Sequence, residues 1–249
     1  MTMVKLAIIG GTGLTSLEGL EVTGRQVVPT PYGEPSGPIT HGALFGKPVS
    51  FLARHGYSHT IPPHMVNYRA NMWALKHVGA DHIVAFAAVG GISGDIPPGR
   101  LIILDQIIDY TWSRGHTFFE SDLDEVIHID FTNPYCEALR ELLVEAARDV
   151  ELDVREQGTY GATQGPRLET AAEIGRLARD GCDVVGMTGM PEAALARELG
   201  LCYAACAICT NWAAGVHGSE ISMDDIRKTL NANRSKAERL LTALMKIVQ

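Results

Sequence analysis

Short runs of β-branched and other apolar residues recur along the chain, and several of them are apolar at consecutive rather than alternate positions. A strand that is apolar on both faces needs a cover on both faces, which is typical of the parallel or mixed sheets of α/β proteins. The runs that we expect to form strands are Lys5–Ile9, Val49–Ala53, His82–Ala88, Leu101–Ile108, Asp183–Met187 and Leu201–Ile208. The pattern therefore predicts an α/β architecture.

Helical patterns lie between and after these runs. Asn133 and Pro134 are typical of a helix start, with a capping side chain followed by a proline in the first turn. Ser222 and Asp225 resemble a capping box and predict a long C-terminal helix. Further helices are expected at Val66–His77, Thr170–Arg179 and Pro191–Leu199. No repeat or low-complexity linker divides the chain, so we expect one domain over residues 1–249.

Charge and hydropathy exclude several classes of partner. The formal net charge is −8 and no run of Lys and Arg is longer than a pair, so nothing in the chain would hold a nucleic acid. The N-terminal apolar run of four residues ends at Gly10, which is too short for a secretory signal. No apolar stretch approaches the roughly 18 residues of a membrane-spanning helix. We therefore expect a cytoplasmic protein that binds neither nucleic acid nor membrane.

Five cysteines are too few and too scattered for a disulfide framework. Three of them, Cys202, Cys206 and Cys209, have the spacing C-x3-C-x2-C, which resembles an iron–sulfur motif. Their segment is apolar enough to be a buried strand, in which the outer sulfurs would lie roughly 23 Å apart. We therefore predict that all three are small apolar core residues.

A glycine-rich turn, Gly10–Leu14, directly follows the first expected strand. Its glycines let backbone N–H groups approach an anion, and Thr12 adds a hydroxyl group. A dinucleotide fingerprint starting at Gly11 would need Gly or Ala at the position of Ser16, so a Rossmann-type reductase is disfavoured. The turn alone predicts an anion site at a strand end.

Polar residues also follow later strands. Arg54 and His55 end the second run, and a guanidinium group can present two parallel N–H groups to phosphate oxygens. The histidines at positions 55, 59 and 64 suggest a metal site, but no carboxylate has the matching ligand spacing, so we expect no metal. Hydroxyl, methionine and amide side chains at two later strand ends complete a set that suits a small polar ligand with an aromatic base.

Six ordered motifs resemble the purine nucleoside phosphorylase and methylthioadenosine phosphorylase family. They are Gly10–Leu14, Ala53–His55, His59–Pro62, Val66–Asn71, Gly165–Arg167 and Met187–Glu192. The resemblance implies a mixed, barrel-like sheet surrounded by helices, a homotrimer, and reversible phosphorolysis of an N-glycosidic bond. It also implies no metal or organic cofactor, with inorganic phosphate as a co-substrate and a purine nucleoside as the other ligand.

The resemblance assigns roles residue by residue. The implied phosphate ligands are Thr12, Arg54, His55 and Thr188. The implied substrate-binding residues are Met187 under the ribose, Leu168 near the base, Asn211 at the purine edge as the catalytic residue, and Trp212, Ala213 and Ala88. The segment Phe86–Gly90 departs from the family pattern. Related enzymes have a hydroxyl residue here, near the end of the third strand, and this chain has none. One phosphate contact is therefore missing or comes from the backbone.

The residues that the resemblance places at the purine edge predict a substrate with a 6-oxopurine base. Relatives that take 6-aminopurines have an aspartate pair, x-Asp-x-Asp, where this chain has Thr210–Ala213. A carboxylate accepts from a 6-amino group, whereas the amide of Asn211 can donate to N7 and engage O6 and N1–H of a 6-oxopurine. Glu169 also differs from what an adenine pocket requires, and we count it among the specificity residues.

The residues that the resemblance places near the sugar predict a substrate with a 5′-methylthio group. In phosphorylases of ordinary nucleosides a histidine, followed by two acidic residues and an aliphatic one, bonds the 5′-hydroxyl, and this chain has Met223–Ile226 there. A thioether offers no useful donor, and an unpaired buried hydroxyl costs about 1–3 kcal/mol. Met223 therefore favours S-methyl-5′-thioinosine. Methylthioadenosine and ordinary 6-oxopurine nucleosides remain alternative substrates, and a non-catalytic nucleoside-binding protein is the alternative outside the enzymes.

Overall fold

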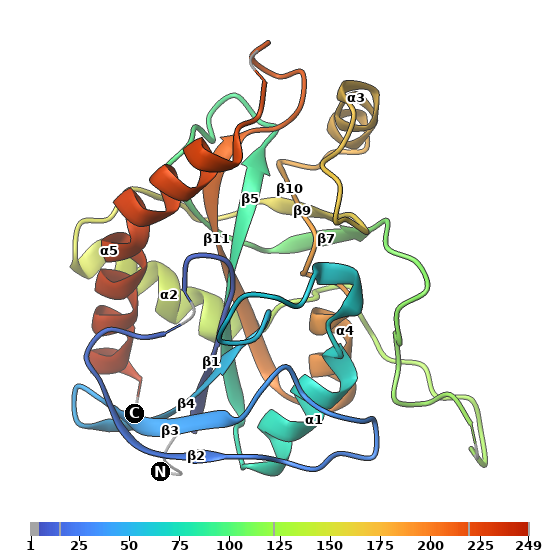
Figure 1. The fold of residues 1–249 in the computed structure, drawn as a ribbon, viewed down its shortest axis with the longest axis vertical. Helices are drawn as coiled ribbons and strands as arrows, with labels where there is room; N and C mark the ends of the chain where they lie inside the picture. Colours follow the sequence, from blue (N-terminus) through green and yellow to red (C-terminus); the bar gives the residue numbers. More distant parts are fainter. Residues whose placement is uncertain (1–4, 15, 122, 219, 249) are drawn as a thin grey trace.

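The computed structural model describes residues 5–14, 16–121, 123–218 and 220–248. Its strands form one mixed sheet of 11 strands, with helices packed around it (Figure 1). The strands are β1 (Leu6–Gly10), β2 (Leu20–Gln26), β3 (Ile39–Leu44), β4 (Lys47–Ala53), β5 (His82–Gly91), β6 (Leu101–Ile103), β7 (Gln106–Asp109), β8 (Val154–Arg155), β9 (Thr159–Ala162), β10 (Val184–Gly186) and β11 (Cys202–Trp212). The α-helices are α1 (Tyr68–His77), α2 (Glu137–Asp149), α3 (Ala171–Arg179), α4 (Glu192–Glu198) and α5 (Met223–Ile247), with a 3₁₀ turn at Pro63–Met65.

The sheet branches at its longest central pair, β5 and β11. β11 runs parallel to β5 along its whole length, while β1 and β10 share the opposite edge. β1 pairs with β5 up to Ala85, and β10 pairs with it again only from Gly90. Among the described strands, none pairs with this edge of β5 over residues 86–89. On this edge, the backbone N–H and C=O groups of residues 86–89 therefore have no partner on a neighbouring described strand.

Helices cover both faces of the sheet, as the doubly apolar strands require. In Figure 1, α2 and α5 lie on one side of the central strands and α1 and α4 on the other. Each pair encloses its own buried cluster, which side chains of β1, β5 and β11 join from alternate positions. The predicted mixed sheet surrounded by helices is therefore confirmed.

Two predicted elements differ from the structure. The run Leu101–Ile108 is not one strand, because the chain pairs first with β11 and β8 as β6 and then with β9 as β7. The helix predicted from Asn133 begins at Glu137 instead, and its N-cap, Cys136, makes no side-chain capping bond. Tertiary pairing displaces both boundaries: Leu104 N–H donates to Ala205 O, and Cys136 N–H donates to Tyr203 O.

The prediction for Cys202 is wrong, whereas Cys206 and Cys209 are buried thiols as expected. Cys202 forms a disulfide with Cys136, since the bond between Cys136 N–H and the Tyr203 carbonyl brings the start of β11 against the start of α2. Burial raises the pKa of Cys206 and Cys209 to about 12, so both stay protonated.

In the part of the chain that the structure describes, no helix is long and apolar enough to cross a bilayer.

Candidate active site

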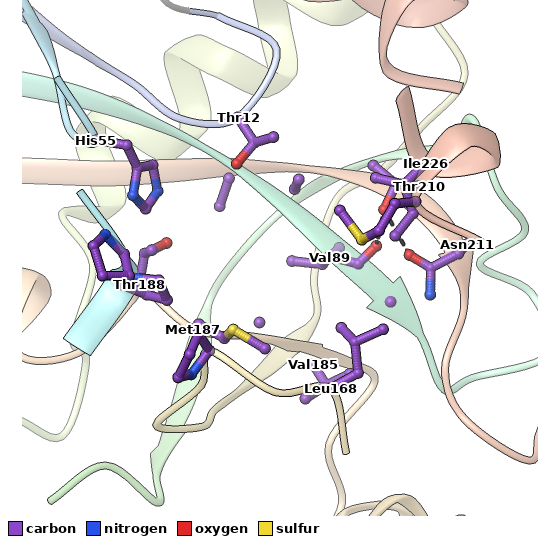
Figure 2. Close-up of a pocket in the computed structure, with 18 of the residues that line it drawn as sticks. Thr12, His55, Val89, Leu168, Val185, Met187, Thr188, Thr210, Asn211 and Ile226 are labelled. Atoms are coloured by element: carbon purple, nitrogen blue, oxygen red, sulfur yellow. Dashed lines mark hydrogen bonds between the residues drawn. The ribbon is translucent and has the colours of Figure 1, made fainter. Parts of the chain in front are cut away.

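A cavity of about 370 Å³ opens where the edge of β5 is unpaired. Ala87–Gly90 form its floor, and the residues that follow β1, β4, β10 and β11 form its walls. Figure 2 shows hydroxyl and imidazole groups of Thr12, His55 and Thr188 at one end, and Asn211 with Thr210 at the other. The cavity thus has two polar ends separated by an apolar middle, to which Val89, Val185 and Met187 contribute.

The first polar end, which we call the anion end, is built from the loop after β1 and the end of β4. A Cβ atom at Gly11 would lie 2.5 Å from the carbonyl oxygen of Phe86 and 2.9 Å from Nη1 of Arg54, so this position accepts only glycine without displacement. The close approach brings Thr12 to the cavity beside Arg54. Thr188 reaches it from the end of β10, where its backbone N–H donates to the hydroxyl of Tyr160.

Arg54 is almost completely enclosed, with 1% of its surface exposed, yet it contributes to the cavity wall. Its Nε and Nη2 donate to the two carboxylate oxygens of Glu192, each at 2.7 Å, and its Nη1 donates to the Phe86 carbonyl at 2.8 Å. Burial alone would lower the pKa of Arg54, but the attraction of Glu192 outweighs it and holds the pKa above its ordinary value. The guanidinium is therefore charged and fixed in one orientation.

His55 is neutral at physiological pH. Burial, followed by repulsion from the charge of Arg54, lowers its pKa to about 4. Its Nδ1 lies 2.8 Å from the carbonyl oxygen of Ile61, so Nδ1 carries the ring proton and donates it there. Nε2 is consequently an acceptor.

His59 also lines the anion end, although sequence reasoning gave it no role there. Its ring packs edge-on against His55 at 4.9 Å between centroids, and its Nε2 lies 3.5 Å from the hydroxyl of Thr12. Burial lowers its pKa. Within the described ranges, no group of three or more His, Cys, Asp or Glu side chains could hold a metal ion.

The other polar end, which we call the base end, lies at the last residues of β11. The register of β11 against β5 shifts between Cys209 and Asn211, and this bulge re-aims the side chains that follow. Asn211 Oδ1 accepts from the Thr210 hydroxyl at 2.7 Å, and its Nδ2 donates to the Trp212 carbonyl at 2.8 Å. One N–H and one acceptor lone pair remain on this amide. Glu169 faces the same region, and one of its oxygens accepts from Thr163 at 2.7 Å.

All of the predicted site residues except Trp212 line this one cavity, and their individual roles remain predictions. Trp212 is not among the residues that line the cavity; it follows the bulge in β11, and its ring packs against His217 at 4.3 Å between centroids. Sequence reasoning missed several lining residues, most of them next to residues that it found. These are His59, Thr60, Ile61, Pro62, Pro63, Ala87, Val89, Gly90, Pro166, Val185, Gly186, Thr210, Ile221 and Ile226.

Comparison with known proteins identifies the family. The model of the phosphorylase superfamily matches residues 5–246. The chain belongs to the phosphorylase superfamily. The resemblance drawn from the six motifs is therefore confirmed, and the cavity described above is the candidate site of this enzyme.

Individual relatives align with nearly the whole length of this chain. A probable S-methyl-5′-thioinosine phosphorylase from Pseudomonas syringae pv. tomato is 54% identical over 98% of this chain and 99% of its own. A 6-oxopurine nucleoside phosphorylase from Pyrococcus furiosus is 44% identical over 99% of this chain and 94% of its own. Among solved structures, methylthioadenosine phosphorylase from Schistosoma mansoni in complex with adenine has a TM-score of 0.94 and 34% identity, and the match covers 98% of this chain and 91% of that one.

Proposed function

We propose that this phosphorylase cleaves S-methyl-5′-thioinosine with inorganic phosphate, giving hypoxanthine and 5-methylthioribose 1-phosphate. It would act in purine salvage in the cytoplasm, as a homotrimer without metal or organic cofactor. The observation that carries the proposal is the base end, where an amide and a single carboxylate, Asn211 and Glu169, face the cavity beside Ala213.

Phosphate would occupy the anion end. Arg54, Thr12 and Thr188 offer donors there, and His55 offers an acceptor that suits a protonated phosphate oxygen. The hydroxyl that related enzymes have near Ala87 would be replaced by a backbone group. The N–H of Ala88 points to the same open edge of β5 as the carbonyl of Phe86, because alternate residues of a strand share an edge.

The nucleoside would span the apolar middle, with its anomeric carbon above the phosphate. Displacement of a purine requires cation character at that carbon and relief of the negative charge that develops on the base. Asn211 can donate its free N–H to N7, so the chemistry needs positioning and electrostatics rather than a covalent nucleophile.

The base end favours a 6-oxopurine over adenine. N1 of hypoxanthine carries a hydrogen that Glu169 can accept, whereas N1 of adenine is an acceptor and would face the carboxylate unpaired. The cavity also favours a 5′-methylthio group on the sugar, since Ile221, Met223 and Ile226 line it and none of their side chains can bond a hydroxyl.

A comparison of four substrates tests the proposal. Methylthioinosine, methylthioadenosine, inosine and adenosine are assayed side by side with phosphate, and we expect methylthioinosine to have the highest kcat/KM. Mismatched buried polar groups discriminate by up to about 10⁴–10⁵, so methylthioadenosine should be cleaved poorly. Efficient cleavage of methylthioadenosine would exclude the 6-oxopurine assignment, and preference for inosine would exclude the 5′-methylthio assignment.

A double variant tests the base end directly. Asn211→Asp with Ala213→Asp rebuilds the carboxylate pair that accepts from a 6-amino group and can protonate N7. We expect the ratio of kcat/KM for methylthioadenosine over methylthioinosine to rise by about 10-fold or more. Ala214→Asp, one position beyond the predicted base-reading residues, is the matched control and should leave the ratio unchanged.

A further inference from the structure

Glu192, the acidic partner of Arg54 in a buried ion pair, lies behind the anion end and has no role assigned so far. Glu192, in the first turn of α4, is 1% exposed and is not part of the cavity wall. Its Oε2 accepts from Arg54 Nε, while its Oε1 accepts from Arg54 Nη2 and from the hydroxyl of Tyr203 at 2.8 Å. Tyr203 is itself held by stacking on Tyr135.

These contacts determine which N–H groups of the Arg54 guanidinium remain free to bind a ligand. Arg54 has five N–H groups. The carboxylate of Glu192 accepts from the N–H of Nε and from one N–H of Nη2, and the Phe86 carbonyl accepts from one N–H of Nη1. Among the described residues no partner is found for the remaining N–H on Nη1 and the remaining one on Nη2. Both lie on a group that contributes to the wall of the anion end.

We infer that Glu192 is a positioning residue for phosphate, holding one edge of Arg54 so that one N–H of Nη1 and one of Nη2 face the anion end. This inference rests on the proposed phosphorolysis for the identity of the anion. Tyr203 fixes the carboxylate in turn, so that side chains from α4, from β11 and from the residue after β4 form one rigid chain of contacts.

The pair also sets the charge of the site. A buried guanidinium without a partner is strongly disfavoured, and the carboxylate neutralises it without entering the cavity. Phosphate would then be held by fixed hydrogen bonds rather than by an excess of positive charge. Loss of the carboxylate should leave the guanidinium free to turn, so that binding of phosphate weakens more than binding of the nucleoside.

Glu192→Gln tests the inference, since it keeps the shape of the side chain and replaces one accepting oxygen by a donor. We expect the dissociation constant of inorganic phosphate, measured by titration calorimetry without nucleoside, to rise about 10- to 100-fold, with a similar rise of its KM. The KM of the nucleoside should change less than about threefold. Equal weakening of both ligands, or unchanged phosphate binding, would overturn the inference.

Two further variants keep the test decisive. If Glu192→Gln does not fold, Tyr203→Phe removes one of three bonds to the carboxylate and should raise the phosphate dissociation constant about threefold, and an unchanged value would overturn the inference. Glu137→Gln removes the acidic partner of another buried arginine, Arg140, far from the cavity, and should leave phosphate binding unchanged. If wild type binds phosphate but does not cleave methylthioinosine, the proposed substrate fails while the role of Glu192 stands.

Discussion

Met223 begins α5 at the mouth of the cavity, where 54% of its surface is exposed. Met223→His would supply the hydrogen-bond partner that a 5′-hydroxyl lacks in the present site. One such bond is worth about 1 kcal/mol, so we expect the ratio of kcat/KM for inosine over methylthioinosine to rise about 5- to 10-fold. Met65→His, at an exposed methionine outside the cavity, is the control and should not alter the ratio.

His55 links the site to the pH dependence of stability. Its folded pKa, about 4, lies below the value of about 6.5 in an unfolded chain, so the unfolded state binds a proton first as pH falls. The free energy of unfolding should therefore decrease between pH 6.5 and 4, by at most about 3 kcal/mol from this group. Urea denaturation at pH 7 and pH 4.5 measures the loss.

His55→Asn should remove that part of the decrease, while the same change at the exposed His77, outside the cavity, should retain it. An equal pH dependence in His55→Asn and wild type would mean that His55 is not buried in its neutral form.

At this scale the sequence predicted residues that line one cavity, but not the contacts between them. Thr12, Arg54 and Thr188 could be found because each lies at a strand end within a recognisable motif. The pairing of Arg54 with Glu192 could not, since 138 residues separate them and only the packing of α4 brings them together. The place of Trp212 outside the cavity could not be predicted either, because a β-bulge between Cys209 and Asn211 changes the side to which the following side chains point.

At the scale of elements, the loop after β1 and the open edge of β5 form one unit. Gly11→Ala would place a methyl group against the Phe86 carbonyl and Arg54 Nη1. We expect a loss of about 1–3 kcal/mol in the free energy of unfolding, together with a rise in the phosphate KM of about 10-fold as Arg54 is displaced.

Gly24→Ala in β2 is the matched control, because nothing lies within 4 Å of a Cβ atom built there. It should leave the phosphate KM unchanged. A Gly11→Ala variant with the phosphate KM of wild type would show that the loop after β1 does not shape the anion end.

The doubly apolar strands were predictable, since burial on both faces leaves a continuous apolar run. β2 was not, because it is largely exposed and its sequence carries Glu, Thr, Gly, Arg and Gln. The capping box predicted for α5 is reduced to a bond from the Asp224 N–H to the Ser222 hydroxyl, whereas a complete one forms at Thr170 with Glu173. Local signals therefore fixed the type of most elements, and tertiary pairing fixed their ends.

At the scale of the whole molecule, the segment between β7 and α2 is described over residues 110–121 and 123–136, and we call it the 110–136 segment. Figure 1 shows the described part as a long green to yellow-green loop that extends away from the sheet. Its exposed large apolar side chains include Trp112 (64%), Val126 (75%) and Ile127 (44%). Such side chains on one segment are typical of an interface between subunits.

The family resemblance implies a trimer, and the 110–136 segment is where we expect the contact to form. Light scattering at assay concentration should give three times the mass of one chain. Val126→Glu with Ile127→Glu would bury two charges at the contact, which is strongly unfavourable without partners, so we expect the trimer to dissociate. Asn231→Glu with Ala232→Glu adds the same charge to the exposed face of α5 and should leave the mass unchanged. A monomeric wild-type protein would contradict the trimer itself, whereas a Val126/Ile127 variant that remains trimeric would place the interface elsewhere on the surface.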